Sequence, residues 1–262
     1  MKKRPSAGAI LIVTLAAIYF LVPLFATLLF SLKARPAFQA YVNVLKDPGF
    51  TGSLLYSLVI AILTIAASMA IVVPTAYWVR LRYPRLRPVV EFITLLPFVI
   101  PPVVLVFGLI RAYSSPPLLL TSTSVGSDAL LIGAYVVLAL PYTYRAADVG
   151  MRAIDIATLT EAAQSMGAGS VRIIWQVILP NLRTALISGA FLTLAIVMGE
   201  YTIASFLVRP AFGPYLSLLG QNRAYEPAAV TLISFAITWL AMGVIGLVGR
   251  GSRTRIQITG TR

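Results

Sequence analysis

Long apolar segments alternate with shorter polar ones along most of this 262-residue chain. A helix needs about 20 apolar residues to cross roughly 30 Å of hydrocarbon, and six segments approach or exceed that length. They cover residues 7–32, 54–79, 89–110, 129–144, 184–208 and 227–249. The fourth is the shortest, so we expect its helix to borrow a turn at each end. The pattern predicts an all-α membrane protein with six transmembrane helices in a single domain, 1–262.

The composition narrows the classes of protein that fit this pattern. Hydrophobic residues make up 59% of the chain and charged residues 11%, whereas soluble domains carry about 25% charged residues. There is no cysteine and no histidine, which excludes thiol nucleophiles and removes the commonest general base and metal ligand. We therefore expect no catalytic residue, no metal site and no intramembrane enzyme.

The formal net charge of +13 serves as a guide to topology. The basic residues lie at the ends of apolar segments and are not interleaved with aromatic residues on one face, so we expect no nucleic-acid site. With a cytoplasmic N-terminus, fifteen of the 21 lysines and arginines fall on the inner side, in agreement with the positive-inside rule. Both termini and the long polar segment 145–183 are then predicted to be cytoplasmic.

The third apolar segment contains Pro97, Pro101 and Pro102. Proline removes a backbone donor and clashes with the preceding turn, so a regular helix cannot continue through all three positions. Irregular backbone at membrane depth is tolerated where protein or a water-filled cavity surrounds it. The sequence predicts a broken third helix, at a place surrounded by protein or by a water-filled cavity.

The polar segment 145–183 predicts two short amphipathic helices joined by a glycine turn. Asp155 can cap the first helix, Gly167 suits a left-handed position at its end, Ser170 can cap the second helix, and Pro180 ends or bends that helix. The expected apolar face of the first helix holds Ile156, Leu159, Ala162, Ala163 and Met166. The expected face of the second holds Val171, Ile174, Trp175 and Ile178.

The same segment carries a spaced motif. Glu161-Ala162-Ala163 is followed after three residues by Gly167, and after nine more by Val177-Ile178-Leu179-Pro180. This pattern resembles the cytoplasmic EAA loop of permease subunits of binding-protein-dependent ABC importers, the type I class with six spans. Valine at position 177 is a mild departure, because isoleucine is common there. The coupling residues that the resemblance implies are Glu161, Ala162, Ala163, Met166, Gly167, Val177, Leu179 and Pro180.

The resemblance also implies the partners of the chain. The loop would fit a cleft on an ATP-binding subunit, and two such subunits would bind ATP and Mg. A second permease subunit, usually a different one in polyamine-type systems, would complete the pathway, and a solute-binding protein would deliver the cargo. The setting implied is the cytoplasmic (inner) membrane of a bacterium or an archaeon. The alternative for the loop is a surface helix pair packed on its own bundle.

The positions of the lysines show independently whether the chain could itself hydrolyse ATP through a P-loop. A P-loop needs a glycine-rich run that ends in lysine, and Lys2, Lys3, Lys33 and Lys46 are the only lysines in the sequence. None of them follows such a run. We expect a transport subunit that is no ATPase and holds no cofactor.

Glu200 lies within the fifth apolar segment, next to Tyr201. A charged side chain at membrane depth costs about 2.5–3.5 kcal/mol on insertion scales, so it faces protein or water. Two interpretations stay open. Glu200 and Tyr201 line a substrate passage beside Pro101 and Pro102, or Glu200 is a structural residue hydrogen-bonded to a neighbouring helix or across a subunit interface.

The cargo is the least determined feature. Residues 198–207, MGEYTIASFL, resemble permeases grouped with spermidine/putrescine, ferric iron, phosphonate and sulfate importers. A carboxylate in the path favours a cation, so polyamine is the leading hypothesis, with ferric iron, phosphonate and sulfate-type anions as alternatives. A self-contained channel or secondary transporter, with Glu200 as its ion or proton site, is the rival class. Glu91 is interpreted as a local partner of Arg87.

Overall fold

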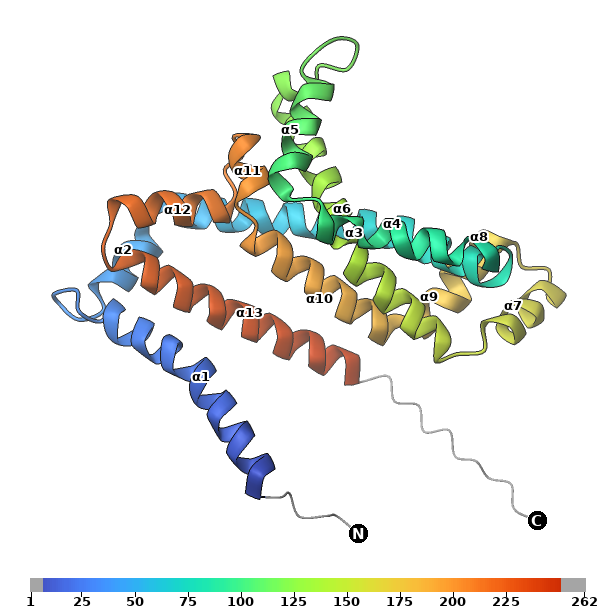
Figure 1. Cartoon of the computed structure of the whole chain (residues 1–262), viewed down its shortest axis with the longest axis horizontal. Coiled ribbons are helices and arrows are strands. Elements are labelled where there is room, and N and C mark those ends of the chain that lie inside the picture. The colour runs from blue at the N-terminus through green and yellow to red at the C-terminus, as the bar shows by residue number, and fades with distance from the viewer. Residues whose placement is uncertain (1–6, 251–262) are drawn as a thin grey trace. The chain divides into compact units, whose positions relative to one another are not determined.

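The computed structural model describes residues 7–250, with side chains from Ile10 to Leu240, and this part of the chain is helical without strands. The basic residues counted at the two ends (Lys2, Lys3, Arg4, Arg253, Arg255 and Arg262) lie outside it. The chain divides into two compact units, one made of residues 1–52 and 215–239, the other of residues 53–214 and 240–262. Figure 1 shows the elements along the chain.

The first unit contains α1 (Ala7–Ser31), α2 (Gln39–Lys46), the start of α3 (Pro48–Leu81), most of α12 (Phe212–Asn222) and α13 (Glu226–Arg250). The helices α2 and α12 form within segments that the sequence pattern treats as plain connectors. Polar contacts hold this unit together: the Tyr215 hydroxyl donates to the Asp47 carboxylate over 2.9 Å, and Asn43 Nδ2 donates to Glu226 over 3.0 Å. Such pairs join residues far apart in sequence, which explains why periodicity alone misses them.

The second unit is built around α6 (Ser124–Arg152), which packs against α10 (Arg183–Gly199) and α4 (Arg87–Val99). The helix extends the expected segment 129–144 at both ends, so the borrowed turns are confirmed. Its side chains join two apolar clusters. One cluster includes Tyr144, Ala147 and Met151 with residues of α3 and of the 145–183 segment, and the other includes Leu131, Ala134 and Tyr135 with residues of α5 (Pro102–Tyr113).

The proline break in the third apolar segment is confirmed. The helix α4 continues through Pro97 and ends at Val99, and α5 begins at Pro102 with a bend of 100° between the two. Ile100 is extended, with φ −86° and ψ 113°, because a residue that precedes proline is excluded from the helical region by the proline ring. Figure 1 shows α5 turning away from α4 at this point.

The fifth apolar segment is not the single helix 184–208 that the pattern predicts. The helix α10 ends at Gly199, and α11 (Thr202–Phe206) follows after a break at Glu200 and Tyr201. Gly213 lies against this break, because a β-carbon at that position would come within 2.3 Å of the Glu200 carbonyl oxygen. The absence of a side chain at position 213 therefore lets the two segments meet.

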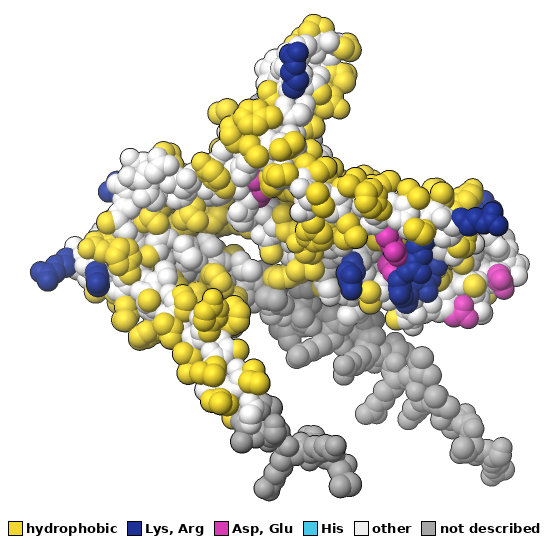
Figure 2. Space-filling view, in the orientation of Figure 1, with side chains coloured by type: hydrophobic (Ala, Val, Ile, Leu, Met, Phe, Trp, Pro, Cys, Tyr) yellow, Lys and Arg dark blue, Asp and Glu magenta, His cyan; other side chains and the backbone are white. Residues whose placement is uncertain are grey.

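Three helices within the described residues are long and apolar enough to cross a membrane: Ile10–Ser31, Pro48–Leu81 and Ser124–Arg152. Two bent pairs, Pro84–Val99 with Pro102–Tyr113 and Ser170–Asn181 with Arg183–Gly199, raise the number to five if each is one span. The sixth expected segment coincides with α13. Apolar side chains cover much of the surface in Figure 2, as lipid-facing helices require.

Gly213→Ala tests the close approach at the break. We expect this substitution to lower the thermal stability of the purified chain by an amount typical of overpacking, about 1–3 kcal/mol, because the Glu200 carbonyl must move. Gly220→Ala is the matched control on the same helix α12, where a β-carbon meets nothing within 4 Å. Alanine is favoured over glycine in a helix, so the control should be neutral or slightly stabilising. Equal effects of the two substitutions would contradict the close approach.

Candidate functional site

The first eight residues of the 145–183 segment continue α6 to Arg152. The helix α7 (Ile156–Ser165) follows, and Asp155 caps it as predicted. The Asp155 carboxylate accepts the backbone N–H of Thr158 over 3.2 Å and the Thr158 hydroxyl over 2.7 Å. These two hydrogen bonds, the hydroxyl first, hold the pKa of Asp155 below its ordinary value. The carboxylate thus stays charged at the positive end of the helix dipole.

Gly167 has the left-handed conformation predicted for it, with φ +81°. Its N–H donates to the Gln164 carbonyl over 2.8 Å, and the N–H of Ala168 donates to the Ala163 carbonyl over 3.0 Å. A β-carbon at Gly167 would meet no atom within 4 Å. The backbone conformation alone is what requires glycine here, because a left-handed turn costs other residues about 1–2 kcal/mol.

The second helix differs from the predicted one. It starts as α8 (Ser170–Ile173), widens into one π-helical turn over Ile174–Ile178 and closes as α9 (Leu179–Asn181). Ser170 makes no capping hydrogen bond, so that expectation is wrong: the Gly169 carbonyl opens the helix by accepting the N–H of Ile173. Pro180 lacks an N–H and crowds the preceding turn, which accounts for a widened turn just before it. An 83° bend follows into α10, so the bend expected at Pro180 is confirmed.

The buried side of this helix pair packs into the first apolar cluster, and its members from the segment are Ile156, Ala163, Ile173, Ile174 and Ile178. A hydrogen bond of 3.2 Å between the hydroxyls of Tyr77 and Thr160 adds a polar tie to α3. The helix pair is therefore fixed to the ends of α3 and α6 and does not hang free as a loop.

The outer side carries large apolar side chains. Met166 is 82% exposed, Val171 70% and Trp175 59%, so the prediction that they share the packed faces is wrong. Met166 follows the last residue of α7, and the π turn changes the direction of the side chains from Ile174 to Ile178. We call Met166, Val171 and Trp175 the outer apolar edge.

The implied coupling residues divide between these two sides. Ala163 is buried, Val177 and Leu179 are half-buried, and the exposed ones are Glu161, Ala162, Met166, Gly167 and Pro180. Glu161 lines a cavity of about 240 Å³ together with Trp78, Arg82 and Gln164. The cavity is open to a side chain from outside the chain.

Glu200 holds the break in the fifth apolar segment together. Its carboxylate accepts the backbone N–H of Ile203 over 2.8 Å and of Ala204 over 3.2 Å, and the Tyr135 hydroxyl of α6 over 2.9 Å. These are the contacts that the structural interpretation of Glu200 calls for.

The other implied pathway residues lie near this break without a direct bond to Glu200. The helix α5, which begins at Pro102, packs against α11, and the rings of Phe107 and Phe206 are 4.8 Å apart. Tyr201 is 49% exposed, and Pro101 is also exposed. Within the described part of the chain, the hydrogen bonds of Glu200 go to α6 and α11 and none reaches Pro101 or Pro102. The helices that follow the two breaks therefore pack against each other, and Tyr201 and Pro101 are both exposed.

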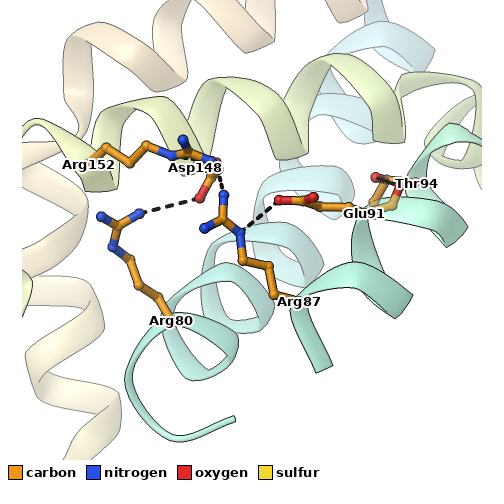
Figure 3. Close-up of polar contacts among 6 residues, drawn as sticks. All are labelled: Arg80, Arg87, Glu91, Thr94, Asp148 and Arg152. Atoms are coloured by element: carbon orange, nitrogen blue, oxygen red, sulfur yellow. Dashed lines mark hydrogen bonds and ion pairs between the residues drawn. The ribbon is translucent and has the colours of Figure 1, made fainter. Parts of the chain in front are cut away.

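Asp148 is a functional candidate that sequence reasoning missed. Arg152 donates to its carboxylate over 2.6 and 2.9 Å, and Arg80 and Arg87 approach it at 3.4 and 3.6 Å. The expected pair of Arg87 with Glu91 is confirmed at 2.8 Å, and this hydrogen bond raises the pKa of Arg87. Figure 3 shows these side chains converging from α3, α4 and α6. The i,i+4 spacing of Asp148 and Arg152 is the one local feature of the sequence that could have indicated an ion pair here.

A second missed ion pair lies at the opposite end of α6. Arg209 Nε donates to Asp128 over 2.8 Å, and the Tyr56 hydroxyl donates to the same carboxylate over 2.5 Å. The three residues come from α3, α6 and the segment after α11. No local pattern in the sequence indicates this contact.

Comparison with known proteins gives a consistent result. A profile of the family described as binding-protein-dependent transport system inner membrane component matches residues 63–256. A probable molybdenum ABC transporter permease protein of Haloferax volcanii is 32% identical over 191 residues, which are 69% of this chain and 70% of that protein. A putative 2-aminoethylphosphonate transport system permease protein of Salmonella typhi is 27% identical over 253 residues, 92% of this chain and 94% of that protein.

Two further similarities are narrower. The ferric transport system permease protein FbpB of Actinobacillus pleuropneumoniae is 30% identical over 122 residues, so that the match spans 47% of this chain and only 17% of that relative. The crystal structure of a bacterial alginate ABC transporter, in complex with an alginate pentasaccharide-bound periplasmic protein, has a chain with TM-score 0.69 and 17% identity, covering 97% of this chain and 95% of that one. This last likeness shows the fold.

A double-mutant cycle tests the bond between Glu200 and Tyr135. We expect Glu200→Ala and Tyr135→Phe each to lower thermal stability by about 1 kcal/mol or more, and the double variant to lose less than the sum because both remove the same bond. A pathway role for the Glu200 charge predicts a different result, in which Glu200→Gln impairs transport while Tyr135→Phe leaves it unchanged. Additive losses of stability would contradict the bond.

Proposed function

This chain belongs to the family of binding-protein-dependent transport system inner membrane components, and we propose that its α7–α9 segment is the docking site for an ATP-binding subunit. The chain is a multi-pass permease subunit of an ABC importer. A permease of this kind forms part of a passage and depends on other subunits for energy and cargo delivery.

The outer apolar edge is the observation that carries the docking proposal. Exposed apolar groups beside polar ones mark surfaces that bind other proteins, and Met166, Val171 and Trp175 are exposed on the same segment as the exposed Glu161. The opposite side of the same helices is packed on α3 and α6. A partner that covers the edge would bury three large apolar side chains without disturbing the packing beneath.

The anchoring of the segment supplies the route by which a partner could act on the membrane helices. The π turn and α9 lead into α10 through one bend, and Ile174 and Ile178 share a cluster with Val73 and Met151. A displacement of α7–α9 would therefore exert force on α3, α6 and α10 at the same time. ATP-driven closure of two ATP-binding subunits is the proposed source of that displacement, with ATP and Mg held by those subunits.

The remaining partners and the orientation are proposed from the charge count and from one protein of similar fold. The charge count supports a cytoplasmic position for α7–α9 and both termini. A second permease subunit would complete the passage. The alginate transporter that shares this fold is in complex with a periplasmic protein, which supports a solute-binding protein as the partner that delivers the cargo.

We propose a small polar solute as cargo, without a preference for polyamine. The polyamine hypothesis relied on a free carboxylate, whereas Glu200 accepts hydrogen bonds from Ile203, Ala204 and Tyr135. The relatives described above are named for ferric ion, molybdenum and 2-aminoethylphosphonate. These three chemistries are the first candidates for a transport assay.

Reconstitution in vesicles tests the class of transporter. With ATP-binding subunits, a solute-binding protein and ATP present, we expect uptake of the cargo; without the ATP-binding subunits uptake should fall to background, because the chain has no P-loop. The assay is radiolabelled solute uptake, with a proton or sodium gradient as the comparison. Uptake driven by the gradient alone would establish the rival secondary transporter.

Gly167→Ala tests the docking segment. Alanine in the left-handed conformation costs about 1–2 kcal/mol, enough to weaken docking about five- to thirtyfold if the turn must keep this shape. Gly169→Ala is the matched control, since Gly169 has φ −75° and open space around its α-carbon. Affinity for the ATP-binding subunit is the measurement, with membrane insertion checked in parallel. Equal affinities of the two variants would refute the role of the turn.

A further inference from the structure

The ends of α3, α4 and α6 carry more positive charge than they can neutralise. Four guanidinium groups share two carboxylates in this cluster, whose members are Arg80, Arg87, Arg145, Arg152, Glu91 and Asp148. Three arginines share the carboxylate of Asp148. Arg152 approaches it to 2.6 Å, whereas Arg80 and Arg87 stay at 3.4 and 3.6 Å. The Asp148 side chain is only 16% exposed, whereas the side chains of Arg80, Arg87 and Arg152 are 32%, 41% and 50% exposed, so water screens part of the excess charge.

Arg145 is the member of the cluster that lacks a protein partner. It is exposed, and it makes no ion pair or side-chain hydrogen bond with any residue that the structure describes. It lies one turn before Asp148 on α6, on the side where Arg87 arrives from α4. Its guanidinium is therefore available to a ligand.

All members of the cluster except Arg80 line a cavity of about 290 Å³ between α4 and α6, together with Tyr144. The lining thus holds the guanidinium groups of Arg87, Arg145 and Arg152 and two carboxylates, and the volume lies just below the range of about 300–1,000 Å³ for ligand pockets. Such a volume suits one small group. Guanidinium forks bind phosphate through paired hydrogen bonds, which makes a phosphate group the best match for this lining.

The rim of the cavity is apolar. Leu95 is 50% exposed and Val149 57%, and both line the same cavity. Figure 2 shows charged side chains gathered on a surface that is otherwise largely apolar. A ligand that combines a phosphate with an acyl chain satisfies both parts, because basic pockets between membrane helices bind anionic headgroups.

We propose that this cavity is a binding site for a phosphate group, supplied by an anionic phospholipid whose acyl chains lie along α4 and α6. A bound phosphate would neutralise the excess charge and give Arg145 an acceptor. It would also hold together the ends of the helices from which the α7–α9 segment leaves. The proposal concerns the chain itself and does not depend on the docking of an ATP-binding subunit.

The test is lipid binding by the full-length chain in a nonionic detergent, measured by native mass spectrometry. Phosphatidylglycerol is titrated against the zwitterionic phosphatidylcholine. We expect preferential binding of phosphatidylglycerol, and a loss of about tenfold in its affinity for Arg145→Gln, which removes a charge-assisted hydrogen bond. Arg145→Lys, which keeps the charge and loses the fork, should give an intermediate affinity.

Arg85→Gln is the matched control. Arg85 lies in the basic segment between α3 and α4, is exposed and does not line the cavity, so its loss removes one charge without touching the site. We expect its affinity for phosphatidylglycerol to stay within about twofold of that of the unmodified chain, as for a distant, screened charge. Equal losses for Arg85→Gln and Arg145→Gln, or no loss for Arg145→Gln, would overturn the proposal.

A second arm separates the two sources of phosphate. Inorganic phosphate is titrated into the lipid-bound chain. Competition at millimolar phosphate that is weakened by Arg145→Gln would assign the site to a soluble phosphate, whereas resistance to competition would assign it to the lipid. Failure of both ligands to bind in an Arg145-dependent manner would show that no phosphate site exists, and the uptake and docking tests would be unaffected by that result.

Discussion

Backbone polar groups at membrane depth must find partners within the protein, because hydrocarbon supplies none and each unpaired group costs several kcal/mol. This constraint accounts for how the breaks in the apolar helices are built. At the break after α10, the Glu200 carboxylate accepts the N–H groups of Ile203 and Ala204 that open α11. Gly213 packs against the Glu200 carbonyl at the same turn. The backbone N–H groups freed by the break thus find acceptors within the protein.

The same constraint governs how force could cross the membrane surface. Helices whose hydrogen bonds are satisfied internally move as rigid rods, so motion concentrates at their ends and bends. In the second unit, the bends are the 100° turn before Pro102 and the 83° turn before α10. The π turn that precedes Pro180 lies next to the 83° turn. The α7–α9 segment is packed on α3 and α6 and is continuous with α10. It therefore contacts α3, α6 and α10 close to a bend where the direction of a helix can change.

The sequence predicted the features that one or two residues impose on their own backbone. Pro101 excludes helix at Ile100, Asp155 caps α7, and Gly167 permits a left-handed turn, each through local sterics or a local hydrogen bond. It did not predict the break at Glu200: the cap itself is local, but the hydrogen bond from Tyr135, 65 residues away, and the close approach of Gly213 are not. The outer position of Met166 and Trp175 also escaped prediction, since an ideal helical period does not allow for a π turn. Contacts between distant segments, such as Arg209 with Asp128, leave no periodic trace.

The carboxylates of the second unit indicate where cargo selection resides. Glu200 caps a helix and binds Tyr135, Asp128 pairs with Arg209, and Asp148 is surrounded by arginines. Each of these three carboxylates is committed to contacts within the fold, and none of the three is left free to bind a cation. A passage built in this way carries no fixed charge preference from these three residues. Under the proposed function, discrimination among cargoes would therefore fall to a solute-binding protein, and this chain would supply the passage and the docking surface.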